Sequence, residues 1–400
     1  PPPPPPPPPL FFIIIIFIII IIFSLSFFFF YFFYSSSFSY YDFDFYYYFY
    51  VVFDVFDVVD VDYDVYGDDD VLIRVNSCGI CGSDIHGMDG SSGRRIPPII
   101  MGHEASGTIE SVGKNVHTWK SGDRVTFDST IYCGKCDYCN NGQVNLCENR
   151  RVIGVSPGSY KQNGAFAELV SIPARILYKL PDSLSFEEAA FVEPVSIALH
   201  GVKRIPNVKS KTAVVIGAGM IGLLVIQALK FSGASKVIAV DLDEAKLLKA
   251  KELGADEALL SNEETVTKIH HITNGGADVS IEVVGMSATL NLAIQCTSKG
   301  GSISLIGNIE PKTEFPLQAV VTQELTLYGS CSSNGEYEEA LSILEFSMEI
   351  MPYDSTVNDH YGDILWKLGK EIEARYYWKK AINLDTVSYT HLTLPTIYSV

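Results

Sequence analysis

The feature that most constrains the fold is an apolar run that leads directly into a glycine-rich turn. Residues 212–216 read Thr-Ala-Val-Val-Ile, which is typical of a parallel strand buried on both faces. The run enters Gly217-Ala-Gly219-Met220-Ile221-Gly222, and apolar residues at helical spacing follow as far as Phe231. A second apolar run ends at Asp241, nineteen residues beyond Gly222. A lone Gly-x-Gly-x-x-Gly is common, but this one lies between a strand and a helix and so predicts a dinucleotide site.

This unit predicts the cofactor and the architecture of the second half of the chain. The glycines allow a tight turn, admit a pyrophosphate to the helix N-terminus and let helix and strand pack closely. Asp241 can accept hydrogen bonds from ribose hydroxyls and would repel a 2′-phosphate, so NAD is expected in preference to NADP, although Lys246 lies close by. Two further apolar runs, 278–284 and 301–306, extend the pattern to a doubly wound parallel sheet of the Rossmann type.

Cysteine spacing predicts a metal site in the first half. Of the eight cysteines, four fall within fifteen residues with the spacing C-x2-C-x2-C-x7-C; they are Cys133, Cys136, Cys139 and Cys147. Four thiolates on such short arms can close a tetrahedral zinc site with no open position, which indicates a structural ion. An iron–sulfur centre is the less favoured alternative. With no credible secretion signal, zinc is favoured over disulfides and a cytoplasmic location is expected.

Two further motifs lie among short strands separated by glycines, a pattern that predicts a small β-rich barrel. They read Cys78-Gly-Ile-Cys81-Gly-Ser83-Asp-Ile-His86 and Met101-Gly-His103-Glu104-Ala-Ser-Gly107. Both resemble elements of the zinc-containing medium-chain dehydrogenases, and the resemblance extends from about Val71 to about Ser333. It implies a GroES-like catalytic domain over 71–195 and an NAD-binding Rossmann domain over 196–333. It also implies a catalytic zinc bound by Cys81 and His103, at which a hydride passes from an alcohol to NAD.

The remaining site residues follow from the same resemblance. Glu193 stands where alcohol dehydrogenases of the family usually carry Cys. A glutamate at this position resembles the sorbitol, threonine and galactitol-phosphate dehydrogenase branches, in which the residue equivalent to Glu104 can also coordinate the metal. Both glutamates are therefore candidate ligands, with Glu193 acting directly or through water. Ser83 and His86 match the family's proton relay; a turn cap and a surface histidine are the alternatives. Val284 and Ile306 are either nicotinamide neighbours or plain sheet core.

The resemblance implies a secondary alcohol or polyol as substrate. Sorbitol is the first expectation, followed by threonine, a sugar-phosphate polyol and a butanediol. Relatives of this kind also form homo-oligomers. The net charge of −18 includes ten aspartates among the first seventy residues, and no basic patch interrupts the acidic balance. Nucleic acid is therefore excluded as a partner, and an anionic membrane surface would repel the chain.

The flanks differ from the dehydrogenase in composition. Residues 1–70 hold nine prolines followed by runs of Ile, Phe, Tyr and Val, and they contain no Lys, Arg, Glu, Ala or Cys. This composition indicates a non-native low-complexity extension. The alternative is a membrane anchor at 10–33, which would make the chain a membrane-tethered dehydrogenase. Residues 334–385 show a 34-residue periodicity that predicts tetratricopeptide-like helices, and 386–400 resembles a translated adapter. The catalytic domain is then expected to be incomplete, with little turnover. An inactive, tetratricopeptide-type interaction protein is the alternative.

Overall fold

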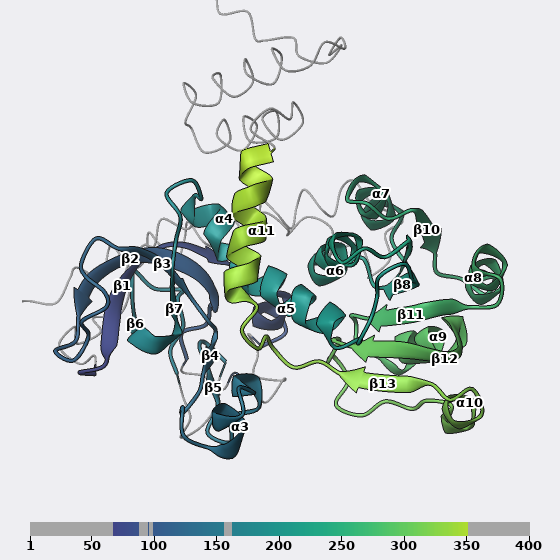
Figure 1. Cartoon of the computed structure of the whole chain (residues 1–400), viewed down its shortest axis with the longest axis horizontal. Coiled ribbons are helices and arrows are strands. Elements are labelled where there is room, and N and C mark those ends of the chain that lie inside the picture. The colour runs from purple at the N-terminus through teal and green to yellow at the C-terminus, as the bar shows by residue number, and fades with distance from the viewer. Residues whose placement is uncertain (1–66, 88–94, 96–98, 156–161, 351–400) are drawn as a thin grey trace, which may run out of the picture. The chain divides into compact units, whose positions relative to one another are not determined.

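The computed structural model describes residues 67–87, 95, 99–155 and 162–350 (Figure 1). The predictions for residues 1–66 and 351–400, including the second tetratricopeptide-like helix and the tail, lie outside the described residues. Within the described part no helix is long and apolar enough to cross a membrane. The described residues form a β-rich half followed by a half of alternating strands and helices, as the sequence predicts.

The first half is built on a five-stranded antiparallel sheet. Its strand order is β6-β1-β2-β3-β7, with bounds Leu169–Pro173, Asp70–Gly79, Glu104–Val112, Arg124–Phe127 and Leu177–Lys179. A separate two-stranded ribbon pairs β4 (Thr130–Ile131) with β5 (Arg151–Val152). Its helical elements are α2 (Gly82–Ile85), α3 (Asp137–Asn140), η2 (Val144–Leu146), η4 (Ala174–Ile176) and α4 (Phe186–Ala190). The apolar core of this half lies between the strands and contains Val71, Ile73, Val125 and Phe127.

The second half is a parallel sheet with the order β10-β9-β8-β11-β12-β13. Taken in chain order the strands are β8 (Thr212–Ile216), β9 (Lys236–Asp241), β10 (Glu257–Leu260), β11 (Ala277–Glu282), β12 (Thr297–Leu305) and β13 (Thr326–Gly329). This is the 3-2-1-4-5-6 order of the doubly wound dinucleotide fold, which binds its ligand where the strand order reverses. The reversal lies between β8 and β11, at the end of the strand that the glycine turn follows.

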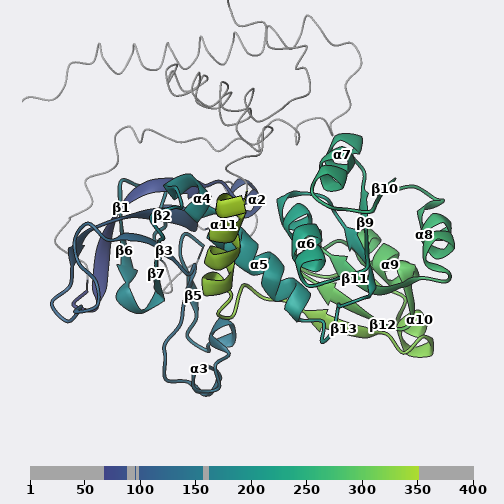
Figure 2. The same ribbon diagram turned by 45° about the horizontal axis from the view of Figure 1, so that its top comes forward.

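Helices cover both faces of the parallel sheet (Figures 1 and 2). They are α6 (Met220–Phe231), α7 (Glu244–Glu252), α8 (Thr265–Thr273), α9 (Ser287–Cys296) and α10 (Leu317–Thr322). Along β8, Ala213 and Val215 join the core beneath α6, whereas Val214 and Ile216 join the core beneath α9. Successive side chains of a strand point to opposite faces, so a strand covered on both sides must be apolar throughout.

Helix α5 (Val192–Lys203) connects the two halves. It contacts β2 of the first sheet as well as α6 and β12 of the second. The predicted domain boundary at 195/196 falls inside this helix, so α5 belongs to both predicted domains. Glu193 lies in its first turn and His200 seven residues later, which places the two side chains about two turns apart on one face.

Helix α11 (Tyr337–Ile350) differs from its prediction as a tetratricopeptide-like helix. Tyr337, Ala340 and Leu341 are buried in the same core as α5 and α6, and the Tyr337 ring stacks on Tyr178 of β7 at 5.0 Å between centroids. An amphipathic pattern predicts a helix but does not say what its apolar face packs against. The first residues of α11 therefore belong to the same apolar core as α5 and α6.

Candidate active site and metal centres

Three predicted ligands come together where α2 and β2 begin. Cys81 immediately precedes α2, His103 immediately precedes β2, and Glu104 is the first residue of that strand. Their ligand atoms all lie within 4.8 Å of one another. Glu104 Oε1 is buried and has no hydrogen-bond partner in the described structure, and His103 Nδ1 has a carboxylate oxygen of Asp84 at 3.6 Å, which leaves the other ring nitrogen of His103 for a ligand. Because buried polar atoms nearly always have partners, this set of thiolate, imidazole and carboxylate fits a zinc ion.

Acidic groups are concentrated around these three side chains. Burial raises the pKa of Glu104, and burial together with the charge of Glu104 raises the pKa of Glu193 to about 8, although His103 lowers both. Burial lowers the pKa of His103, but Asp84, Cys81 and Glu193 raise it by more, so it lies well above 6.5. The pocket therefore stabilises positive charge, as a divalent cation site requires.

Glu193 is buried beside this group but is not one of the three residues whose ligand atoms meet. Its Oε1 accepts a hydrogen bond of 3.1 Å from the Ser129 hydroxyl, and it lies close enough to His103 and Glu104 for their charges to affect its pKa. This arrangement is compatible with either of the two roles predicted for Glu193.

Ser83 and His86 lie in and just after α2, and no contact within the described residues joins them. The Ser83 hydroxyl instead accepts a 2.9 Å hydrogen bond from Arg95, and His86 is exposed at the C-terminal end of the helix. Arg95 also donates to Asp84, whose Oδ1 lies 3.6 Å from His103 Nδ1. Neither residue was predicted from the sequence: Arg95 belongs to no motif, and Asp84 lies between Ser83 and His86 in the motif that begins at Cys78.

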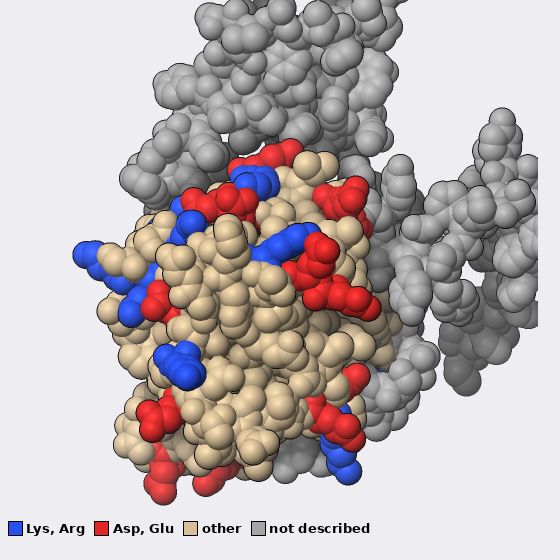
Figure 3. Space-filling view, turned by 90° about the vertical axis from the view of Figure 1, so that its right-hand side faces the viewer, with Lys and Arg blue, Asp and Glu red and all other residues tan. Residues whose placement is uncertain are grey.

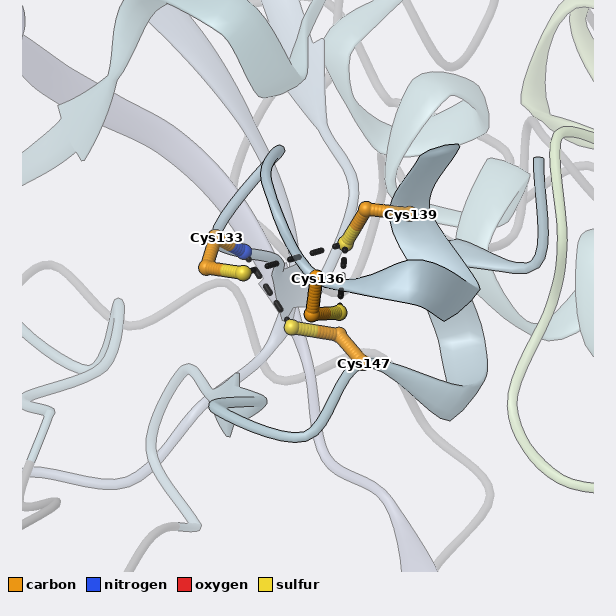
Figure 4. A group of neighbouring side chains, drawn as sticks. All are labelled: Cys133, Cys136, Cys139 and Cys147. Atoms are coloured by element: carbon orange, nitrogen blue, oxygen red, sulfur yellow. Dashed lines mark hydrogen bonds between the residues drawn. The ribbon is translucent and has the colours of Figure 1, made fainter. Parts of the chain in front are cut away.

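The four clustered cysteines form a second candidate metal centre (Figure 4). Cys136 and Cys139 have their sulfur atoms 3.5 Å apart, and the sulfurs of Cys133 and Cys139 are 4.0 Å apart. A tetrahedral zinc ion with Zn–S bonds of about 2.3 Å separates its sulfurs by roughly 3.8 Å, so these distances fit zinc. Backbone N–H groups of Lys135 and Cys136 lower the pKa of the Cys133 thiol to about 6, which favours the thiolate. None of the eight cysteines forms a disulfide, and Cys78, Cys296 and Cys331 lie outside both groups of candidate metal ligands.

Hydrogen bonds tie this cysteine lobe to the segment before α11. The Val144 N–H donates to Asn334 at 3.0 Å, and the Asn145 amide donates to the Cys331 carbonyl at 2.9 Å. His200 of α5 pairs with Glu336 through a contact of 3.1 Å. The lobe and α5 are thus connected to residues 331–336, just before α11, by polar contacts made across 136 to 190 residues of sequence.

The predicted cofactor loop follows β8 as expected. Gly217 has a φ of 99°, and a Cβ atom at Gly222 would lie 1.9 Å from the Gly217 carbonyl oxygen, so neither position accepts a side chain without rearrangement. Gly219 is the N-cap of α6, and Met220 and Ile221 form its first turn, where helix N–H groups can bind phosphate.

Asp241 and the two nicotinamide candidates lie at the carboxyl ends of their strands. Asp241 ends β9, and its carboxylate accepts a 2.6 Å hydrogen bond from the Ala218 N–H of the glycine turn. Val284 follows β11, and its side chain packs over Gly217. Ile306 follows β12 and packs against Gly201 of α5. Asp241 and Val284 therefore adjoin the glycine turn that follows β8, whereas Ile306 packs against the core that contains α5 and α6.

Comparison with known proteins identifies the family. The alcohol dehydrogenase GroES-like domain model matches residues 67–182, and the zinc-binding dehydrogenase model matches residues 221–345. The chain is 36% identical over 270 residues to L-idonate 5-dehydrogenase of Vitis vinifera, covering 65% of this chain and 72% of that protein. It is 33% identical over 300 residues to sorbitol dehydrogenase of Bacillus subtilis, covering 73% and 83%. The chain belongs to the zinc-dependent alcohol and polyol dehydrogenase family.

A solved dehydrogenase has the same fold. The crystal structure of a zinc-binding dehydrogenase from Sinorhizobium meliloti 1021 bound to NADP has a TM-score of 0.64 and 31% identity, covering 70% of this chain and 82% of that one. The match of the dehydrogenase model to residue 345 includes the first turns of α11. This agrees with the packing of Tyr337 and corrects the prediction that the dehydrogenase resemblance ends at about Ser333.

Proposed function

We propose that this dehydrogenase oxidises a polyol at a zinc centre formed by Cys81, His103 and Glu104, with NAD as hydride acceptor. The observation that supports this most strongly is the convergence of three ligand atoms within 4.8 Å, from the partly buried Cys81 and from the buried His103 and Glu104. A zinc ion would supply the Lewis acidity that lets an alcohol lose its proton near neutral pH, and NAD would accept the hydride.

The neighbouring side chains have distinct parts in this proposal. Arg95 donates a hydrogen bond to the Ser83 oxygen, so the hydroxyl proton of Ser83 is free to move while its oxygen receives the proton of a substrate hydroxyl. Onward transfer to His86 requires water or a rotamer change, since the two residues do not touch. Glu193 is held by Ser129 and remains beside the metal ligands, either as a ligand itself or as the partner of a water molecule.

The cofactor preference rests on Asp241. Its carboxylate lies on the glycine turn, where the 2′-phosphate of NADP would place a second negative charge beside it. We therefore propose NAD for this chain, in contrast to the NADP bound by the Sinorhizobium meliloti enzyme. The same repulsion would be lost in a variant with a neutral residue at this position.

The substrate class is proposed from the relatives and from Glu193. The relatives are named as acting on idonate and sorbitol, which are both polyhydroxylated, and Glu193 offers a buried carboxyl group near the reacting atoms. A polyol with several hydroxyl groups is therefore proposed, with sorbitol tested first.

A homo-oligomer in the cytoplasm is proposed alongside the activity. Strand β13 is the last strand of the parallel sheet, and Phe315, Leu317 and Val321 nearby expose apolar side chains. Such a patch beside a sheet edge favours association of two copies. On the face shown in Figure 3, acidic and basic residues are scattered around a wide uncharged area, and Lys and Arg form no patch that would favour nucleic acid.

The test measures zinc and turnover together in the full chain. Two zinc ions per chain are expected from the two ligand groups. The proposed function also expects formation of NADH that depends on sorbitol, in contrast to the little turnover predicted from the sequence for an incomplete catalytic domain. Cys81→Ala should abolish turnover and remove one zinc ion. Cys296→Ala, which changes a buried thiol of α9 away from both groups, is the matched control and should retain both ions. Full zinc content and turnover in Cys81→Ala would refute the proposal.

A further inference from the structure

Arg95 is a buried cation beside the candidate active site. Only 3% of the residue is exposed, and its NH2 group donates to Ser83 Oγ at 2.9 Å and to Asp84 Oδ1 at 3.1 Å. Asp84 is itself 2% exposed. A buried guanidinium is stable only when it is paired and hydrogen-bonded, so this contact with Asp84 is what permits Arg95 to lie here.

The local sequence makes room for this side chain at Gly87. A Cβ atom at Gly87 would lie 2.2 Å from Arg95 Cδ and 3.1 Å from its Cγ. The aliphatic part of Arg95 thus passes over the bare backbone at Gly87, just beyond α2. Any larger residue at position 87 would displace the guanidinium from Ser83 and Asp84.

Asp84 links Arg95 to two of the proposed zinc ligands, Cys81 and His103. Its Oδ2 accepts a 3.0 Å hydrogen bond from the Cys81 N–H, and its Oδ1 faces His103 Nδ1 at 3.6 Å. A carboxylate behind a metal-binding histidine fixes the orientation of the ring and leaves the other ring nitrogen for the metal. Arg95 supplies an opposite charge 3.1 Å from the Asp84 carboxylate at this buried position.

The Nε atom of Arg95 is buried and has no hydrogen-bond partner among the described residues. An unpaired donor of this kind is unusual, because most buried polar atoms in folded proteins have a hydrogen-bond partner. Departures of this kind are expected at functional sites, where a side chain is held for its contacts with other groups.

We propose that Arg95 is a positioning residue of the active site, holding Asp84 against His103 and Ser83 in place to receive the substrate proton. This inference rests on the proposed function. Arg95 does not touch the metal or the substrate in this account; it acts through Asp84 and Ser83. Loss of the guanidinium would leave Asp84 without its cation and would release both the His103 ring and the Ser83 hydroxyl.

The test compares Arg95→Met and Arg95→Lys in the full chain loaded with Co²⁺ in place of zinc. Methionine keeps much of the length and removes the charge, so we expect a changed visible absorption spectrum of the active-site Co²⁺ and a 10- to 100-fold lower metal affinity in chelator competition. The kcat for polyol oxidation should fall by a similar factor, with KM for NAD unchanged. Lysine keeps the charge but not the forked geometry of the guanidinium. The metal affinity and kcat of Arg95→Lys should therefore lie between those of the wild type and of Arg95→Met.

Arg124→Met provides the matched control. Arg124 lies in the same half, and its guanidinium donates to the carbonyls of Pro181, Asp182 and Leu184 and lies over the Phe186 ring. Its loss should lower thermal stability without changing the Co²⁺ spectrum. If the four-cysteine lobe of a variant still binds its metal ion, that part of the variant is folded.

Two outcomes separate this inference from the proposed function. If Arg95→Met and Arg95→Lys both keep the wild-type spectrum, metal affinity and kcat while Cys81→Ala loses them, Arg95 has no positioning role and the proposed function stands. If Cys81→Ala keeps the wild-type spectrum, the proposed function itself is wrong. Should Arg95→Met fail to fold, Arg95→Lys decides alone, and an unchanged spectrum in that variant overturns the inference.

Discussion

Tyr337→Phe removes one hydroxyl group that joins α11 to the catalytic half. The Tyr337 side chain is fully buried, and its oxygen accepts a 3.1 Å hydrogen bond from the Ser129 N–H. The Ser129 hydroxyl in turn donates to Glu193, so this one contact connects the start of α11 with the neighbourhood of the candidate zinc ligands. Phenylalanine keeps the ring that stacks on Tyr178 and loses only the acceptor.

The expected cost follows from the Ser129 N–H left without a partner. An unsatisfied buried donor costs about 1–3 kcal/mol, whereas the preserved ring keeps its packing. Truncation to alanine would also remove the buried ring, and so should cost about 3–5 kcal/mol. The difference between the two variants separates the hydrogen bond from the packing.

Hydrogen exchange followed by mass spectrometry measures this cost where it arises. In Tyr337→Phe, protection of the peptide that contains the Ser129 amide should fall by about 5- to 150-fold, which corresponds to 1–3 kcal/mol. Tyr178 supplies the other ring of the stack, and its hydroxyl has no hydrogen-bond partner in the described residues. Tyr178→Phe is therefore the control, and it should change the protection of the Ser129 amide little. Unchanged protection at Ser129 in Tyr337→Phe would refute the assignment of α11 to the dehydrogenase core.

Three further predictions concern the lobe, a buried acid and the cofactor. Cys147→Ser should lower zinc from two ions per chain to one, measured by metal analysis; retention of both would contradict the structural site. Burial raises the pKa of Asp128 to about 7 from 3.8, so its stabilisation is full below about pH 4 and is lost as pH rises through 7. The free energy of unfolding of the wild type should therefore fall between pH 5 and pH 8, by up to about 3 kcal/mol more than that of Asp128→Asn. Denaturant titrations at the two pH values measure both changes, and equal changes would contradict the raised pKa. Asp241→Ser should reduce the ratio of kcat/KM for NAD to that for NADP by at least about tenfold, which corresponds to 1.4 kcal/mol, and an unchanged ratio would exclude charge repulsion as its cause.

Features contained in one short segment were predictable from the sequence. The glycine turn needs a strand before it and a helix after it, and all three lie within residues 212–231. The four cysteines lie within fifteen residues, so their spacing alone predicts a closed site, and their sulfur atoms do meet. The candidate ligands Cys81 and His103 required the resemblance, because spacing does not reveal which distant motifs approach each other.

Contacts between distant segments were not predictable. Ser129 and Tyr337 are 208 positions apart, and nothing in either local sequence marks the partner. Arg95 belongs to no motif, and its role emerges only when its guanidinium is seen between Ser83 and Asp84. The periodicity at 335–374 predicted a helix where α11 lies, but it did not predict that Tyr337, Ala340 and Leu341 pack in the core of α5 and α6, because periodicity carries no information about the surface that covers an apolar face.

The most direct test of the account is anomalous diffraction at the zinc absorption edge from crystals of the full chain. Two peaks are expected, one among the four cysteines and one bonded to Cys81 Sγ at about 2.3 Å and to a His103 ring nitrogen at about 2.0–2.1 Å. A crystal with zinc only in the cysteine lobe, and with Cys81 and His103 bonded to other protein groups, would contradict the central claim.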